Sequence, residues 1–447
     1  MLHERTGLGL PAAVTVSRPV RRKDTMSALT PAPTAAGPVR FGVNYTPRQG
    51  WFHSWLDLDL DAVGEDLAAI AALGADHVRL FPLWPLLQPN RTLIRPRALE
   101  DVRAVVDVAA SVGLDAVVDV VQGHLSSFDF VPSWLLTWHR RNKFTDPEVV
   151  AATAALVREV ARAVADAPNL VGLTLGNEVN QFSASNHPDS DAVTVAEAEA
   201  WTRTLLDAAR EGAPAGMHTV ANYDAAWFMD DHAFTPDQSA QLGDATVVHS
   251  WIFDGTGQRY GARSHEVAHR AEYYLELARA FSPAPDRTLW LQEVGAPRSV
   301  LEEADVPWFV RSTVENALDC PGLWGVTWWC SHDVSRDLAD FPPLEHTLGL
   351  FDEHGRIKGA GEAFRDAVAA AKESTAPAPR GPAIELPVGP DPLLRRSAAA
   401  PGGSVFEAWM DASRDGQRPT VQVVREHGEA CGGDTRTGGA AATRQPV

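Results

Sequence analysis

Short apolar runs recur along the chain at intervals that suit alternating strands and helices. Each run is four to seven residues long, which is the usual length of a buried strand. Between two of them, Val63, Leu67, Ile70 and Leu73 are spaced four and three residues apart, as on one face of a helix. The predicted strands are Val39–Tyr45, His77–Pro82, Ala116–Val121, Val171–Leu175, His218–Ala221, Thr246–Trp251, Leu289–Gln292 and Gly325–Trp329.

Capping signals mark where several of the intervening helices begin. Asp146-Pro147-Glu148 reads as an N-cap, a first-turn proline and a favourable acid. Thr194 with Glu197 forms a capping box, and Ser264 precedes the segment that runs to Phe281.

Strands that are apolar on both faces and alternate with helices predict a parallel sheet. Eight such units between residues 39 and 371 favour an α/β fold of the (β/α)₈ or TIM-barrel type. A doubly wound open sheet is the alternative, but it needs a glycine-rich turn after the first strand. The turn here is Asn44-Tyr45-Thr46-Pro47, which lacks that fingerprint.

The barrel pattern is flanked by two segments of different composition. Residues 1–38 are rich in Pro, Ala and Arg, show no signal-peptide pattern and are predicted to be disordered. Residues 39–371 form the predicted barrel domain. Residues 372–447 are mostly Ala, Gly, Pro and Arg, so we expect a largely disordered tail with at most a short helix at Ser404–Met410.

Composition narrows the functional class. The net charge of −19 argues against nucleic acid as a partner, because phosphates require a basic surface. No apolar run reaches about 18 residues, so no membrane span is expected. The odd number of cysteines, three without CxxC spacing, predicts no disulfide framework and fits a cytoplasmic protein.

Polar and aromatic residues stand at the end of nearly every predicted strand. In a TIM barrel the active site is built from the carboxyl ends of the strands. A purely structural role would not require such residues at every strand end. The series is Asn44, Arg79, Gln122, His124, Asn177, Glu178, Asn222, His249, Trp251, Glu293, Trp328 and Trp329.

Glu178 and Glu293 end the predicted fourth and seventh strands, which lie across the barrel mouth from each other. Two carboxyl groups there can flank one glycosidic bond, with burial raising the pKa of the one that acts as acid. A separation of about 5–5.5 Å implies hydrolysis with retention, and about 6.5–9.5 Å implies inversion. Either glutamate alone is also compatible with a structural ion pair.

Neighbouring strand ends supply plausible supporting groups. Arg79 would hold Glu293 ionised and oriented, and Asn177 would contact the 2-hydroxyl of the sugar. His249 and Trp251 would contact the nucleophile or the sugar. Of the adjacent Trp328 and Trp329, alternation along a strand lets only one face the lumen, and Trp328 is favoured.

One motif points to different chemistry. His265-Glu266-Val267-Ala268-His269 matches the HExxH helix of zinc peptidases, with Glu293 downstream as a loose third ligand. The motif lies at the start of the helix after the sixth strand and leaves the strand-end residues unexplained. A zinc peptidase is therefore a remote alternative, and no metal or other cofactor is expected.

Gly176-Asn177-Glu178 and Gln292-Glu293 resemble the motifs of clan A glycoside hydrolases, family five. Three longer stretches resemble the actinobacterial subfamily eighteen: Phe41 to Pro47, Gln122 to Asp129 and Trp328 to Asp333. The resemblance covers about Val39 to Phe364. It implies a retaining exo-β-mannosidase that acts on small oligosaccharides such as Man-β-1,4-GlcNAc inside the cell.

That resemblance also implies roles for individual residues. Glu178 would be the acid/base and Glu293 the nucleophile. The family commonly has His-x-Tyr at strand six, whereas this chain has His249-Ser250-Trp251, and tryptophan cannot accept a hydrogen bond. The implied substrate contacts are Asn44, Arg79, His124, Asn177, Asn222, His249, Trp251, Trp328, Trp329 and Asp333.

Other activities of the same family remain open at this point. An endo-β-1,4-mannanase or β-glucanase would use the same two carboxylates in an open cleft. A non-catalytic sugar-binding barrel would not need both. Long loops at Trp84–Arg97, Gly123–Phe144 and Ser331–Leu348 favour a closed pocket and exo action. The expected partner is a small oligosaccharide, and the sequence predicts no oligomeric state.

Overall fold

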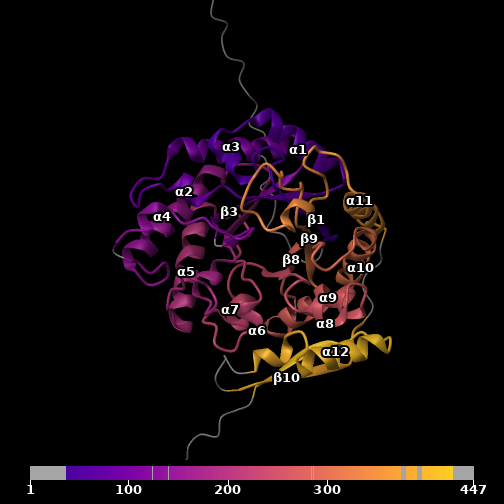
Figure 1. Cartoon of the computed structure of the whole chain (residues 1–447). Helices are drawn as coiled ribbons and strands as arrows, with labels where there is room; N and C mark the ends of the chain where they lie inside the picture. The colour runs from indigo at the N-terminus through magenta and orange to yellow at the C-terminus, as the bar shows by residue number, and fades with distance from the viewer. Residues whose placement is uncertain are drawn as a thin grey trace, which may run out of the picture.

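Seven parallel strands curl around a common axis at the centre of the computed structural model (Figure 1), in the order β6-β3-β2-β1-β9-β8-β7 among the described residues. Those residues are 37–122, 124–138, 140–282, 284, 286–373, 379–389 and 395–425. The strands are β1 (Arg40–Asn44), β2 (His77–Leu80), β3 (Asp115–Gln122), β6 (Leu170–Asn177), β7 (Thr246–Ser250), β8 (Leu289–Val294) and β9 (Leu323–Trp328).

The fifth predicted strand, His218–Ala221, is present as an extended segment rather than as a strand. Its backbone is hydrogen-bonded to β6, with Thr219 N donating to Leu173 O at 2.9 Å and Leu175 N donating to Thr219 O at 2.8 Å. The bridge between Thr174 and Thr219 is parallel, as between neighbouring strands of a barrel. The fold is therefore TIM-barrel-like, with this segment following β6.

Helices form the outer layer around the strands (Figure 1). The cap predictions at Asp146, Thr194 and Ser264 are confirmed, since each side chain accepts a hydrogen bond from a first-turn amide. The longer helices are α1 (Leu60–Ala72), α3 (Pro96–Ser111), α4 (Pro147–Val164), α5 (Val195–Gly212), α9 (His265–Ala280), α10 (Val306–Leu318) and α11 (Gly359–Ala371). Four short helices lie in loops: α2 (Trp84–Leu87), α6 (Ala225–Phe228), α7 (Pro236–Gln241) and α8 (Thr256–Tyr260).

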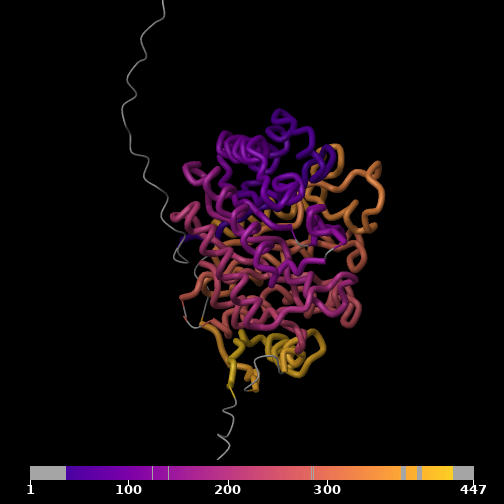
Figure 2. The backbone as a smooth tube through the Cα atoms, turned by 90° about the vertical axis from the view of Figure 1, so that its left-hand side faces the viewer, coloured from indigo at the N-terminus to yellow at the C-terminus, as the bar shows by residue number. Residues whose placement is uncertain are grey.

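The prediction of a largely disordered C-terminal tail is wrong for residues 379–389 and 395–425. They form β10 (Ala383–Val388), α12 (Ser404–Arg414) and β11 (Thr420–Arg425), which lie outside the barrel (yellow in Figure 2). The Trp409 indole is fully buried, 5.4 Å from the ring of Tyr273 on α9. The amino-acid composition gave the wrong prediction because the apolar face of α12 is short and is buried only where α9 covers it.

The predicted disorder of residues 1–36, and of the last residues beyond 425, falls outside the described residues. None of the described helices combines the length and apolar character that a bilayer crossing requires. Cys320 and Cys330 are buried free thiols.

Side chains fill the barrel lumen near the amino-terminal ends of the strands. Trp290 Nε1 donates to Thr327 Oγ1 at 2.8 Å, and the His77 ring packs 5.1 Å from Trp324. Gly42 is required there, because a Cβ atom at this position would lie 2.2 Å from the His77 ring. The described side chains thus fill this end of the lumen, and the carboxyl ends of the strands are left for a ligand.

Candidate active site

A cavity of about 540 Å³ opens at the carboxyl ends of the strands. Predicted site residues from several strand ends line it, together with side chains from the loops that follow. The predicted residues in its wall are His124, Asn177, Glu178, His249, Trp251, Glu293 and Trp329.

Strand register brings the key side chains into one layer. Asn44 of β1 pairs with Arg79 of β2, and His249 of β7 pairs with Glu293 of β8. The register of β7 and β8 shifts between Val248 and His249. Such irregularities re-aim side chains and are frequent beside active sites.

Glu178 follows β6 immediately and has a left-handed backbone, with φ 48° and ψ 34°. This region is uncommon for residues other than glycine, and its occupation is typical of functional sites. Gly176 lets the neighbouring strand approach, because a Cβ atom there would lie 1.9 Å from Val121 O. The Glu178 carboxylate accepts from His249 Nδ1 at 2.8 Å and from Gln181 Nε2 at 2.9 Å.

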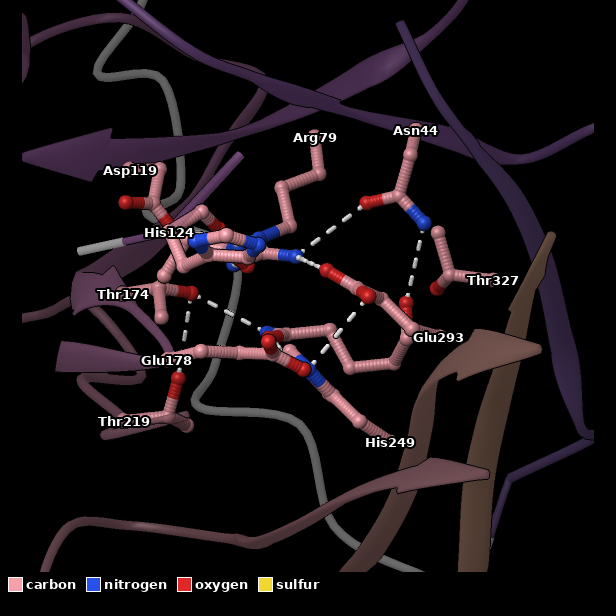
Figure 3. A network of polar contacts seen from close by, with 12 residues as sticks. Asn44, Arg79, Asp119, His124, Thr174, Glu178, Thr219, His249, Glu293 and Thr327 are labelled. Carbon is pink, nitrogen blue, oxygen red and sulfur yellow. Dashed lines mark hydrogen bonds and ion pairs between the residues drawn. The ribbon is translucent and has the colours of Figure 1, made fainter. Parts of the chain in front are cut away.

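Glu293 lies within β8 and is 3% exposed. Its Oε1 accepts from Arg79 Nη1 at 2.7 Å, and its Oε2 lies 3.4 Å from His249 Nδ1. A carboxylate oxygen of Glu178, a ring nitrogen of His249 and a carboxylate oxygen of Glu293 all lie within 4.8 Å of one another. The two carboxyl groups therefore share one histidine at the floor of the cavity (Figure 3).

Arg79 is fully buried and holds four side chains from different strands. Besides Glu293 it donates to Asp119 at 2.5 Å, to Asn177 Oδ1 at 2.7 Å and to Asn44 Oδ1 at 3.3 Å. Asn44 also donates to Gln292 O at 3.0 Å, which fixes the backbone beside Glu293. Arg79 and Asn44 are thus positioning residues behind the cavity wall.

Asp119 belongs to this network although the strand-end reasoning missed it. It lies inside β3 and is fully buried. Burial raises its pKa to about 6, against the opposing effect of Arg79. A charged residue inside a run that is apolar on both faces must be paired, and this signal was available in the sequence.

A polar chain runs from His249 into the barrel. His249 Nε2 lies 3.2 Å from Gln292 Oε1, and Gln292 Nε2 donates to Thr174 Oγ1 at 3.0 Å. Thr174 is in turn 3.3 Å from Thr219 (Figure 3). Nε2 faces an amide oxygen and Nδ1 faces carboxylates, an arrangement that suits a protonated imidazole, which donates from both nitrogens.

The pKa directions agree with a proton on His249. Burial lowers the His249 pKa, but Glu293 and Glu178 outweigh it and the net pKa is raised. Burial raises the Glu178 pKa, yet the bond and charge of His249 make the net effect a lowering. For Glu293 burial dominates and the pKa is raised. The three groups therefore titrate as one coupled unit.

This result corrects one step of the sequence argument. Burial alone was expected to raise the pKa of Glu178 as the acid. The desolvation is present, but His249 adds a positive charge and a hydrogen bond at 2.8 Å that favour the carboxylate.

Comparison with solved structures identifies the family. A glycoside hydrolase family 5, subfamily 18 enzyme from Streptomyces cattleya, in complex with Manβ1-4GlcNAc, is 56% identical, with a TM-score of 0.85; the match covers 86% of this chain and 94% of that one. An enzyme of the same subfamily from Bifidobacterium longum subsp. longum, also with Manβ1-4GlcNAc, is 49% identical over 86% and 91% of the chains, TM-score 0.84. The chain belongs to glycoside hydrolase family 5, subfamily 18.

A more distant structure supports the fold of this glycoside hydrolase. An exo-β-1,4-mannosidase from an Opitutaceae bacterium is 23% identical, with a TM-score of 0.72, over 90% of this chain and 72% of that one. No protein-family model and no curated protein sequence matches the chain.

The preference for Trp328 over Trp329 is wrong. Trp328 packs outward, with its ring 6.2 Å from those of Phe309 and Phe364 on the helices. Trp329 lines the cavity of the hydrolase instead. The inward positions of β9 include Thr327, which contacts Trp290 inside the barrel, so alternation places Trp329 rather than Trp328 on the inner face.

Asn222 and Asp333 also lie away from the cavity. Asn222 is buried and donates to Ser239 Oγ at 3.0 Å. Asp333 pairs with Lys358 Nζ at 2.7 Å and accepts from Gly349 N, so it anchors the loop after β9. Asn222 was predicted from its place at a strand end and Asp333 from the resemblance of its stretch to subfamily eighteen, and neither fixes the direction of a loop side chain.

Several residues that line the cavity come from loops and carried no sequence signal. Tyr223 and Asp224 follow the extended fifth segment, and Glu345 lies in the loop after β9. Burial raises the pKa of Tyr223, and Glu178 adds to that effect. Loop residues of this kind become visible only once the fold brings them together.

The HExxH match is structural in this hydrolase. His265 Nε2 lies 3.1 Å from Ser413 Oγ, and Glu266 pairs with Arg414, both on α12. His269 contacts Glu272 on its own helix. Within the described residues, the cluster whose geometry could hold a metal ion is instead Glu178, His249 and Glu293. A proton on His249 accounts for its contacts.

We expect the His249 pKa to lie above 6.5, the ordinary histidine value, and to fall in Glu178→Gln and in Glu293→Gln. Each substitution removes a negative charge that favours the imidazolium. The measurement is an NMR titration of ring-labelled histidine, with the His249 signal assigned from His249→Asn.

Glu65→Gln provides the control, because Glu65 is an exposed residue on α1 and pairs with Arg48. Its His249 titration should match the native protein. A His249 pKa that is unchanged in both glutamine variants at the site would refute the shared-proton arrangement.

Proposed function

We propose that this glycoside hydrolase is a retaining exo-β-mannosidase that removes terminal β-mannose from small oligosaccharides such as Man-β-1,4-GlcNAc. The observation that carries the proposal is the close pair of carboxyl groups, Glu178 and Glu293, bridged by His249. With their nearest atoms within 4.8 Å, the pair suits the short separation of retaining enzymes. Related enzymes bound to Manβ1-4GlcNAc support the choice of sugar.

Glu293 is the proposed nucleophile. Its Oε1 is held by Arg79 Nη1, which leaves Oε2 directed toward His249 and the cavity. Arg79 favours the ionised form that attack on the anomeric carbon requires. Attack would form a covalent mannosyl–enzyme ester and break the bond to the leaving oxygen.

Glu178 is the proposed acid and base. It must carry a proton when the leaving oxygen departs, and His249 Nδ1 at 2.8 Å is an adjacent donor. After departure of the leaving sugar, the Glu178 carboxylate would take a proton from water, and that water would cleave the ester. The mannose released first would have the β configuration.

An aromatic cluster at the mouth of the barrel supports exo action. It joins the loops that follow β1, β3 and β9: the Trp51 ring lies 4.7 Å from Phe341 and 5.9 Å from Phe128, and Phe128 lies 4.8 Å from Phe341. Ser126 and Leu344, beside this cluster, line the cavity. Loops locked together in this way limit room for further sugars on that side.

The Glu178 side of the cavity suits the leaving sugar. Trp251 and Phe253 lie with ring centroids 4.9 Å apart and line this region with Tyr223. Aromatic faces of this kind pack against the apolar faces of sugar rings. Pro401, from the C-terminal elements, lies in the same wall. The cytoplasmic location stays a prediction.

We expect Glu293→Gln to abolish turnover, since the amide cannot form the ester. Glu178→Gln should slow hydrolysis of Man-β-1,4-GlcNAc by about 10²–10⁴-fold, but slow an aryl β-mannoside with a good leaving group far less. Steady-state rates on the two substrates measure this difference.

Glu100→Gln is the matched control, because Glu100 lies exposed on α3. It should retain native rates on both substrates. If Glu178→Gln slows both substrates equally, or Glu293→Gln keeps native turnover, the assignment of roles is wrong.

Exo action predicts mannose as the first product from β-1,4-mannohexaose. Each cleavage should remove one terminal sugar, because the closed side holds one mannosyl unit. Chromatography at early times should show mannose and the pentasaccharide in equal amounts. Di- and trisaccharides as first products would identify an endo-mannanase of the same family.

A further inference from the structure

A third buried glutamate lines the cavity and has no part in the proposed mechanism. Glu345 begins the short 3₁₀ helix η5 (Glu345–Thr347) in the loop after β9 and is 7% exposed. Its backbone is fixed on both sides: Glu345 N donates to Pro342 O at 3.0 Å, and Glu345 O accepts from Val334 N at 3.2 Å.

No cation lies within ion-pair distance of the Glu345 carboxyl in the part of the chain that the structure describes, although the charge of His124 acts to lower its pKa. No ion pair among the described residues includes it, whereas Glu293 has Arg79. The cavity wall beside it contains Pro342, Leu344 and Trp329, whose surfaces are largely apolar. A buried carboxyl group in such a place is costly unless hydrogen-bond donors reach it.

The electrostatic surroundings agree with that cost. Burial raises the Glu345 pKa to about 7; Ser126 opposes the rise, and Glu293 adds to it. Glu345 and Trp329 line the same cavity, and the Trp329 indole acts to lower the Glu345 pKa. Near neutral pH the carboxyl group can therefore both accept and donate hydrogen bonds.

The position of Glu345 assigns it to one side of the cleaved bond. Glu345 comes directly after Leu344, in the loop whose Phe341 ring lies 4.7 Å from Trp51 in the aromatic cluster of the closed side, and it lines the cavity with Leu344 and Glu293. Glu178 has Gln181 and Tyr223 as neighbours, on the side of the leaving sugar. The nucleophile attacks the sugar that is retained, so Glu345 lies where that sugar binds.

We propose that Glu345 is a specificity-determining residue that hydrogen-bonds the hydroxyl groups at C4 and C3 of the terminal mannose. These groups lie on the ring edge opposite the anomeric carbon, which faces Glu293. The inference rests on the proposed mannosidase function and deepens it. It explains why the terminal sugar must be unsubstituted: a further sugar at C4 would replace the hydroxyl and collide with the Glu345 wall.

The test pairs a side-chain change with a substrate change. Native enzyme and Glu345→Gln are assayed on an aryl β-mannoside and on its 4-deoxy and 3-deoxy analogues. In the native enzyme, loss of a hydroxyl bound to the carboxyl group should lower kcat/KM by about 10- to 100-fold. In Glu345→Gln the parent substrate should be slower, and the same deoxygenation should matter several-fold less.

Asp337→Asn is the control, because Asp337 is exposed on the same loop. It should show the native response to deoxygenation. The proposal is overturned if the native enzyme is insensitive to both deoxygenations, which requires no variant to fold. It is also overturned if deoxygenation of the substrate lowers kcat/KM as much in Glu345→Gln as in the native enzyme. Absence of any hydrolysis of β-mannosides by the native enzyme would instead refute the proposed function.

Discussion

The buried guanidinium of Arg79 links the strands on which the active site depends. It binds Asp119, Asn177, Asn44 and Glu293, so side chains of β1, β3, β6 and β8 meet on one cation of β2. Such an ion costs several kcal/mol to bury unless its partners are well placed. The same network orients Glu293, the proposed nucleophile. Removing the guanidinium would therefore leave Asp119 as an unpaired buried acid and leave Glu293 with His249 as its remaining ion-pair partner.

Around that fixed cation, a single proton governs the chemistry. His249 lies between Glu178 and Glu293, and its own Nε2 is anchored by Gln292. The raised pKa of His249 and the lowered pKa of Glu178 both favour a proton on the histidine in the free enzyme. The proposed mechanism requires that this proton reach Glu178 once a sugar fills the cavity. Side chains such as Trp290 fill the barrel beneath the site, and the aromatic cluster of Trp51 and Phe341 joins the loops at its mouth. The proton exchange is therefore confined to one small volume.

The sequence predicted the strands, most caps and the two glutamates because each leaves a local signal. Apolar runs with polar ends suffice to place Glu178 and Glu293 at strand ends. The sequence did not reveal which way each side chain points. Trp329 faces the inside of the barrel because the inner positions of β9 include Thr327. It also missed contacts that depend on the fold, such as Glu345 in the cavity wall and the packing of α12 against α9.

The configuration of the mannose first released from Man-β-1,4-GlcNAc tests the central claim most directly. NMR distinguishes the two anomers before mutarotation mixes them. A carboxyl pair as close as Glu178 and Glu293 predicts initial β-mannose, through a covalent intermediate on Glu293. Initial α-mannose would mean direct attack by water, and it would contradict the assignment of Glu293 as nucleophile.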